Sequence, residues 1–164
     1  KKKYFILNMQ REENVDDPKK LESFIDIFNN VTKNYKLPII WPIHPRTFLK
    51  LKKLKKKLNR EIKLIKPLGF FDFTFLEKNS ISIFTDSGTV QEEASIFKIP
   101  CLIVRETTER PETIESGSGI IVHNNYSKVK KALNFFLNNA HKTKVIPEYN
   151  VNNVSKKILD ILKK

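Results

Sequence analysis

Short apolar segments alternate with longer amphipathic ones along the whole chain, and this alternation constrains the fold more than any other feature of the sequence. The short segments are only a few residues long and are rich in the β-branched and aromatic residues that favour strands. They are Tyr4–Leu7, Pro38–Ile43, Ile62–Ile65, Ile81–Phe84, Cys101–Val104 and Ile120–Val122. Strands separated in this way by helices predict an α/β domain, with a parallel sheet that carries helices on both faces.

Apolar residues recur at helical spacing in most of the intervening segments, which predicts helices there. The expected helices are Pro18–Tyr35, a basic helix beginning near Pro45, Phe71–Glu77, Ser87–Phe97, Pro111–Glu115, Tyr126–Asn138 and Val151–Leu162. In the basic helix, Leu51, Leu54 and Leu58 would form the buried stripe. The many lysines from Lys50 to Lys66 would then lie on the side that faces solvent.

The charge of the chain is a weaker guide than its pattern. The 164 residues suit one domain, and a hydrophobic content of 40 % excludes a wholly disordered chain. The formal net charge of +13 would by itself suggest a nucleic-acid partner. Much of that charge falls on the expected basic helix, however, and neither aromatic–basic interleaving nor a zinc-ligand pattern accompanies it. We therefore expect a solvated helix face, with no nucleic acid bound and no metal site.

Apolar runs and cysteine content indicate the environment of the protein. No apolar run approaches the ~20 residues that a bilayer crossing needs, so no membrane partner is expected. Cys101 is the only cysteine and cannot form a disulfide within the chain. A reducing compartment, the cytoplasm, is therefore the expected location.

Polar loops follow five of the six expected strands, and in parallel sheets such loops bind the ligand. They are Asn8–Asp17, Pro42–Thr47, Pro67–Asp72, Thr85–Thr89 and Arg105–Pro111. The strongest candidate is the turn of Ser87, Gly88 and Thr89, which would open a helix whose first amides lack internal partners. Such a helix start suits a phosphate or diphosphate. The alternative is an ordinary helix cap, made by Asp86 or Ser87.

Charged residues near this turn have both functional and structural interpretations. One of Glu92 and Glu93 could accept hydrogen bonds from a ribose diol, or both could simply stabilise the helix dipole. Arg110, held extended by the proline that follows it, could fork onto a phosphate. Its alternative is a surface ion pair with Glu109 or Glu112.

The first two loops add three more candidate site residues. Arg11 follows the first strand and could bind an anion. His44 and Arg46 follow the second strand, and we keep both as possible site residues. A lone histidine such as His44 has a structural alternative, because it lacks the partners of a catalytic triad or a zinc site.

Several of these strings, in the same order and with the same gaps, resemble the non-hydrolysing UDP-N-acetylglucosamine 2-epimerase family. They are Arg11-Glu12-Glu13-Asn14-Val15-Asp16, His44-Pro45-Arg46-Thr47, Pro67-Leu68-Gly69, Thr85-Asp86-Ser87-Gly88 with Gln91-Glu92-Glu93-Ala94, and Thr108-Glu109-Arg110-Pro111-Glu112. The resemblance runs from Lys1 to about Leu162. It implies one half of a GT-B-type enzyme, in which two Rossmann-like halves face each other across a cleft. Residues 1–164 would be a single UDP-binding domain, the C-terminal half.

The family inverts C2 of the sugar, so that UDP-N-acetylglucosamine and UDP-N-acetylmannosamine interconvert by elimination and re-addition of UDP. The resemblance therefore implies an isomerase for surface polysaccharide precursors that needs no cofactor. Its partners would be a UDP-sugar, the N-terminal half of the same enzyme and a second copy in a homodimer. The alternatives are a 2-epimerase of a diacetamido-uronate or 6-deoxy sugar, or a glycosyltransferase-like or non-catalytic UDP-sugar-binding domain.

The resemblance also assigns roles to individual residues. UDP would contact Leu68, Phe73, Ser87, Gly88, Thr89, Glu93 and Arg110. Within that set, Leu68 and Phe73 would flank the uracil and Glu93 would bind the ribose. The other four would hold the diphosphate.

The catalytic assignments are Gln10, Arg11 and Glu13, in the loop below the sugar. Family members usually have histidine where this chain has Gln10, and glutamine cannot carry a proton or a positive charge at neutral pH. Thr89 replaces a common glycine, and residues 149–155 replace a Gly-Asp-Gly-like turn. Because the proton-transfer carboxylates of the family lie mostly in the other half, we expect the isolated 164 residues to be inactive.

Overall fold

The structure is a computed structural model that describes residues 3–138 and 146–163. Its centre is a six-stranded parallel sheet in the order β3-β2-β1-β4-β5-β6. The strands are β1 (Phe5–Asn8), β2 (Ile39–Pro42), β3 (Ile62–Ile65), β4 (Ile83–Thr85), β5 (Cys101–Ile103) and β6 (Gly119–Ile121). The chain moves outward from β1 to β3 and then returns to place β4 beside β1. This order confirms the predicted α/β class and puts the switch point, where ligands bind in such sheets, between β1 and β4.

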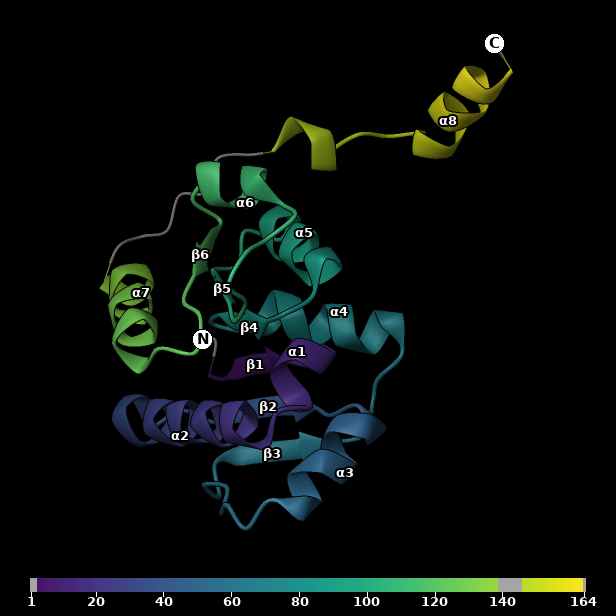
Figure 1. Ribbon diagram of the computed structural model, residues 1–164. Helices are drawn as coiled ribbons and strands as arrows, with labels where there is room; N and C mark the ends of the chain where they lie inside the picture. The colour runs from purple at the N-terminus through teal and green to yellow at the C-terminus, as the bar shows by residue number, and fades with distance from the viewer. Residues whose placement is uncertain (1–2, 139–145, 164) are drawn as a thin grey trace.

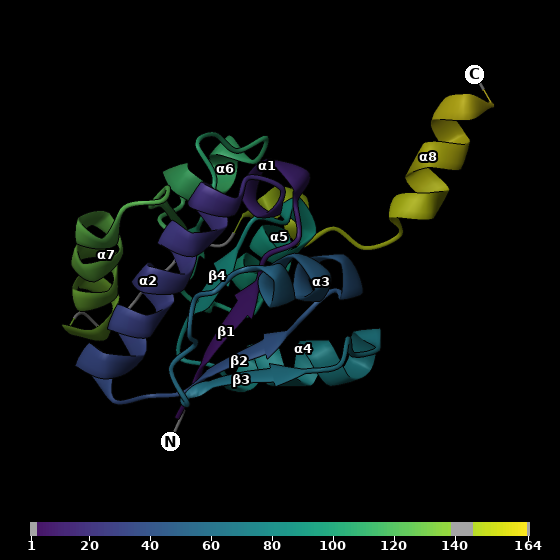
Figure 2. The ribbon, with the colours of Figure 1, turned by 60° about the horizontal axis from the view of Figure 1, so that its bottom comes forward.

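Helices connect the strands and extend beyond the last one (Figure 1). They are α1 (Glu12–Val15), α2 (Pro18–Tyr35), α3 (Pro45–Lys53), α4 (Phe70–Asn79), α5 (Gly88–Ile96), α6 (Pro111–Glu115), α7 (Tyr126–Asn138) and α8 (Val154–Leu162), with a 3-10 turn at Pro147–Tyr149. Figure 2 shows α2 and α7 along one side of the sheet. Within the described residues no helix is long and apolar enough to cross a membrane.

Alternation along β1 builds a core on each face of the sheet. Phe5 and Leu7 enter the larger core with Phe24 and Phe28 of α2, while Ile6 enters the smaller core under α4 and α5. Successive side chains of a strand point to opposite faces, and here both faces are buried. A sheet covered on both sides leaves only its strand ends free to hold a ligand.

The basic helix is shorter than predicted. It ends at Lys53, and Leu54 already has an extended backbone. Leu54 and Leu58 still pack against the larger core, but from a loop that α2 holds. The side chain of Asn29 accepts a hydrogen bond from the Asn59 amide at 2.7 Å and donates one to the Lys57 carbonyl at 3.0 Å. A helix packed with lysines also repels itself, because like charges four residues apart face each other.

The C-terminal helix α8 extends away from the body of the domain (Figure 1). It begins at Val154 rather than at the predicted Val151, because Asn153 has a left-handed backbone with φ of 61°. Asparagine tolerates that conformation better than most residues, although glycine adopts it at lowest cost. The segment that replaces a Gly-Asp-Gly-like turn therefore keeps one backbone conformation that favours glycine.

Candidate functional site

Hydrogen bonds join the loops that follow β1, β4 and β5 into one surface at the switch point. At the centre is Asp86, whose fully buried carboxylate accepts from the amides of Gln10 and Arg11 at 3.0–3.2 Å. The side chain of Asn14 donates to Asp86 at 3.0 Å and to the Val104 carbonyl at 3.2 Å. Burial raises the pKa of Asp86, and these three donors offset only part of that rise. Asp86 therefore does not cap α5, and that structural alternative is wrong for Asp86.

The N-terminus of α5 is open. Ser87 occupies the cap position, yet no side chain caps the helix there, so the cap alternative is wrong for Ser87 as well. The Ser87 amide donates instead to Thr85 Oγ1 at 3.0 Å. The next amides, at Gly88 and Thr89, begin the helix and have no partner within it. This leaves backbone donors and the positive end of a helix dipole at the strand tips.

Arg110 lies over this helix start. A Cβ added to Gly88 would lie 3.7 Å from the Arg110 guanidinium, an ordinary contact distance, so the guanidinium packs directly beside Gly88. The guanidinium Nε donates to Glu92, and Nη1 donates to the Glu109 carbonyl at 3.1 Å. The structural alternative, an ion pair with the side chain of Glu109 or Glu112, is therefore wrong, because the carboxylate that Arg110 contacts is that of Glu92, one turn into α5.

The two neighbouring acids of α5 have different surroundings. Glu92 forms an ion pair with Arg110, whereas the half-buried Glu93 has no ion pair among the described residues. Burial raises the pKa of Glu93. Of these two acids, Glu93 is therefore the one without a competing cation.

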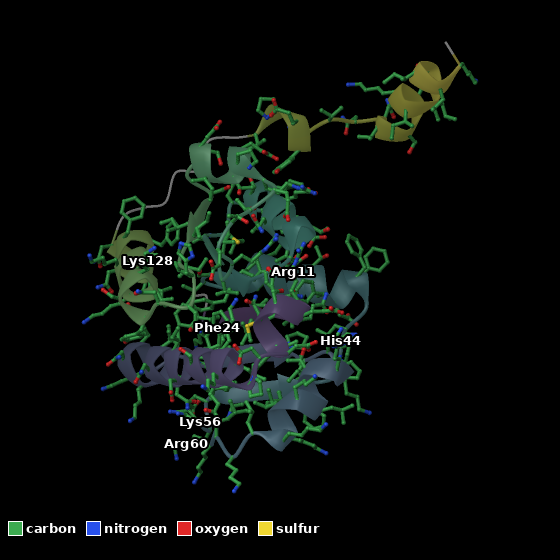
Figure 3. The ribbon with its side chains drawn as sticks, viewed as in Figure 1. Arg11, Phe24, His44, Lys56, Arg60 and Lys128 are labelled. Carbon is green, nitrogen blue, oxygen red and sulfur yellow. The ribbon has the colours of Figure 1, made fainter. Side chains whose placement is uncertain are left out.

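The first two loops form an open hollow of about 450 Å³. It is lined by Gln10, Arg11, Glu12, Glu13, His44 and Arg46. Figure 3 shows Arg11 and His44 on the same side of the molecule, while Lys56 and Arg60 lie on a distant loop. The structure thus brings together the three predicted catalytic residues and both possible site residues.

Two side chains of the hollow also have structural tasks. His44 caps α3, since its Nδ1 accepts from the Arg46 amide at 3.2 Å. Arg46 donates to Glu12 at 2.6 Å and to Asp16 at 2.5 Å, and all three side chains are well exposed. These contacts connect the loop after β2 to α1.

Arg105 is a residue that the sequence reasoning missed. Its guanidinium is almost fully buried and donates to both oxygens of Glu109 at 2.6 and 2.7 Å. Its Nε also donates to Glu13 at 3.2 Å. These bonds hold the pKa of Glu109 down at about 2. An arginine directly after a buried strand was the available signal, because a buried guanidinium needs carboxylate partners.

The two residues predicted to flank the uracil lie on either side of the start of α4. Leu68 is half-buried in the loop after β3. Phe73 packs against the smaller core under α5. Next to Leu68 is an apolar groove of about 370 Å³ lined by Ile43, Pro45, Phe48, Leu64, Ile65, Lys66 and Pro67. A flat, weakly polar ring fits such a surface better than a charged group does.

No cluster of three or more metal-ligating side chains occurs in the part of the chain that the structure describes.

The 3-10 turn before α8 lies against α6, where the Tyr149 hydroxyl donates to Glu112. This bond lowers the pKa of Glu112. Glu112 therefore has a hydrogen-bond partner in the C-terminal segment, while the ion-pair partner of Arg110 is Glu92.

Comparisons with known proteins point to one family. The family described as UDP-N-acetylglucosamine 2-epimerase matches residues 1–163. A protein of that name from Methanocaldococcus jannaschii is 45 % identical over 139 residues, which is 82 % of this chain and 38 % of that protein. The structure of the M. jannaschii UDP-GlcNAc 2-epimerase in complex with UDP-GlcNAc and UDP has a TM-score of 0.89 and 41 % identity. That likeness covers 98 % of this chain and 45 % of the other.

A relative with another substrate in its name is less similar. The UDP-2,3-diacetamido-2,3-dideoxy-D-glucuronate 2-epimerase of Pseudomonas aeruginosa is 35 % identical over 119 residues, or 73 % of this chain and 33 % of that protein. The alternative of a 2-epimerase that acts on a diacetamido-uronate or 6-deoxy sugar is thus not favoured. In each of these comparisons the chain spans less than half of the length of its relative.

Proposed function

The chain belongs to the UDP-N-acetylglucosamine 2-epimerase family, and from this premise we propose that it is the UDP-binding half of an enzyme that interconverts UDP-N-acetylglucosamine and UDP-N-acetylmannosamine. Residues 1–164 would form one Rossmann-like domain, the C-terminal half. The N-terminal half of the same enzyme would close over the strand tips and complete the site. The proposed enzyme acts in the cytoplasm as a homodimer.

The observation that carries this proposal is the uncapped start of α5 beneath Arg110. Ser87, Gly88 and Thr89 offer backbone and hydroxyl donors at the positive end of a helix, which suits a diphosphate. Arg110 would turn from Glu92 to the diphosphate, since an arginine fork fits phosphate oxygens as well as a carboxylate. When UDP departs from the sugar, negative charge grows on the diphosphate, and donors already fixed there stabilise the transition state.

The remaining parts of UDP would follow the edge of the sheet. Glu93 on α5 would accept hydrogen bonds from the ribose hydroxyls. The uracil would lie against Leu68 and Phe73 at the start of α4. The sugar would extend toward the hollow with Gln10, Arg11 and Glu13, where Arg105 holds Glu13 in place.

A non-catalytic UDP-sugar sensor is the second candidate, and Gln10 is the observation that favours it. Gln10 borders the hollow but cannot transfer a proton. In the full-length protein, Gln10→His should raise the rate of epimerisation roughly 100-fold if the missing proton carrier limits the reaction. An unchanged, low rate would favour the sensor.

Isotope exchange tests the epimerase activity directly. The full-length protein is incubated in deuterated water with UDP-N-acetylglucosamine and no acceptor, and NMR follows the C2 proton of the sugar. We expect deuterium at C2 and a UDP-N-acetylmannosamine product. The 164-residue chain alone should bind UDP without exchange. Absence of exchange in the full-length protein would exclude an epimerase and leave a transferase or a sensor.

A further inference from the structure

Gln91 is a buried polar residue of α5 that the proposed function has not used. It lies one turn after Ser87, to whose carbonyl its amide donates at 3.3 Å, and its side chain is fully buried. The side-chain Oε1 accepts a hydrogen bond from the Thr108 hydroxyl at 2.6 Å, whereas Nε2 has no partner among the residues that the structure describes. Burying a half-satisfied amide costs free energy that an apolar side chain would not cost. The bond to Thr108 is therefore what this polar residue adds to the site.

Thr108 extends this contact to Arg110, two residues further along the loop after β5. The single proton of the Thr108 hydroxyl is donated to Gln91. The same hydroxyl oxygen accepts from the backbone amide of Arg110 at 3.1 Å. Two hydrogen bonds thus connect the first turn of α5 with the main chain of Arg110.

The carbonyl of Arg110 is held separately. It accepts from the hydroxyl of Thr113 at 2.7 Å and from the amide of Thr113 at 3.1 Å. Both donors belong to the first turn of α6, so they fix Arg110 relative to α6. Among the hydrogen bonds to the Arg110 main chain, the one through Thr108 is the one that leads to α5.

This connection differs from the contact that holds the Arg110 side chain. The guanidinium is paired with Glu92, and the proposed function requires it to leave Glu92 for the diphosphate. The bonds from Gln91 to the Arg110 amide do not involve the guanidinium, so they can persist while the side chain turns. A fixed main chain limits the positions that a long side chain must search, and so lowers the entropy lost on binding.

We propose that Gln91 and Thr108 are positioning residues, which fix the main chain of Arg110 against α5 so that its guanidinium reaches a diphosphate at the helix start. This inference rests on the proposed function, in which Arg110 and the turn at Ser87 hold the diphosphate. Neither positioning residue needs to touch the ligand. Because they act through Arg110, removing their connection should cost less affinity than removing the guanidinium itself.

The test measures the dissociation constant of UDP by calorimetric titration of the chain. Thr108→Val keeps the shape of the side chain but loses the hydroxyl, and should weaken UDP binding roughly fivefold. Thr108→Ser keeps the hydroxyl and should bind UDP as the parent does. Thr107→Val, a change at the exposed neighbouring threonine, is the matched control and should also leave the affinity unchanged.

A double-mutant cycle distinguishes positioning of Arg110 from general loosening of the loop. In an Arg110→Met background, Thr108→Val should have no further effect on UDP binding, because the group that it positions is absent. An equal fivefold loss in both backgrounds would overturn the positioning role. Uridine, which lacks both phosphates, should bind the parent and Thr108→Val equally when NMR follows the titration.

Gln91→Met tests the other end of the connection. Methionine has a similar length but cannot replace the amide oxygen as acceptor, so the same roughly fivefold loss is expected. Added to Thr108→Val, it should have no further effect. Thermal unfolding shows which variants are folded, and Thr108→Val, at a half-buried position, decides the question even if Gln91→Met does not fold.

The outcomes separate this inference from the proposed function. If the parent chain binds UDP and Thr108→Val binds it equally well, the connection has no positioning role and the UDP site stands. If Arg110→Met binds UDP as the parent does, Arg110 does not hold the diphosphate and the inference fails. If the parent chain does not bind UDP at all, the proposed function and the inference both fail.

Discussion

The two sides of the switch point are built differently. On the β4–β5 side, Asp86 and Arg105 are buried and hold neighbouring loops through hydrogen bonds of 2.6–3.2 Å. On the β1–β2 side, Arg46 and its acidic partners are exposed around an open hollow. We conclude that buried hydrogen bonds organise the loops after β1, β4 and β5, whereas only exposed ion pairs hold the loop after β2 to α1.

The largest effect is expected at the centre of the organised side. Asp86→Ala leaves two amides and the Asn14 side chain without their acceptor, and should lower the free energy of unfolding by about 3 kcal/mol. Denaturant unfolding measures this change. Asp26→Ala, which removes an exposed ion pair with Lys56, is the matched control and should have little effect. Equal losses of unfolding free energy in Asp86→Ala and Asp26→Ala would contradict the contrast between buried hydrogen bonds and exposed ion pairs.

The second prediction concerns the two acids whose pKa values move in opposite directions. Because Glu77 on α4 is fully buried, the folded state keeps its proton up to about pH 8, whereas the unfolded state loses it near its ordinary pKa of 4.5. The stabilisation by neutral Glu77 is therefore complete below pH 4.5 and is lost as the pH rises to 8. Relative to Glu77→Met, the parent should lose about 2 kcal/mol over that window, measured by denaturant unfolding.

Glu109 should give stability the opposite pH dependence. Because Arg105 lowers its folded pKa to about 2, its contribution is present above pH 4.5 and is lost as the pH falls toward 2. Glu109→Gln should flatten the acid side of the stability profile and leave the side above pH 5 unchanged. The stability of the parent should rise between pH 2 and 4.5 and fall between pH 4.5 and 8. If these opposite slopes are absent, the surroundings of Glu109 and Glu77 do not differ as described.

The third prediction concerns the binding of UDP at the N-terminus of α5. Arg110→Met should weaken UDP binding roughly tenfold, because the diphosphate loses the bidentate hydrogen bonds of the guanidinium. Glu92→Gln should strengthen binding, since Arg110 is released from a competing carboxylate. Calorimetric titration measures both, with Glu109→Gln as a control that leaves the Glu92 contact intact. Weaker binding in Glu92→Gln would mean that Glu92 orients Arg110 rather than competing for it.

The smallest effect is expected on the open side. Arg46→Ala removes exposed ion pairs with Glu12 and Asp16, which salt already screens. Thermal unfolding should show no measurable change, at low or at high salt. A clear loss of stability in Arg46→Ala would show that the loop after β2 is held as firmly as the loops that Asp86 and Arg105 connect.

The fold was largely predictable because the strands follow the apolar pattern of the sequence. The end of α3 was not, because Leu54 and Leu58 keep a helical spacing although they pack from a loop held by Asn29. Periodicity records which side chains are buried, and an extended segment can bury the same two leucines.

The candidate site was predictable at the level of its loops but not of its pairings. Motif order located Ser87 and Arg110, and the structure places them at one helix start. The partner of Arg110, the buried arginine Arg105 and the buried acid Glu77 depend on contacts between residues far apart in sequence. A glutamate in a helix normally faces solvent, so no local signal identifies Glu77 as buried.

The central claim is that the strand tips around α5 form a single site for UDP. Amide NMR spectra of the isotope-labelled chain, recorded during titration with UDP, test it most directly. We predict saturable shifts at Ser87, Gly88 and Thr89, accompanied by shifts at Glu93 and Arg110. Saturable shifts confined to other loops, such as the one around Arg60, or no shifts at all, would contradict the account.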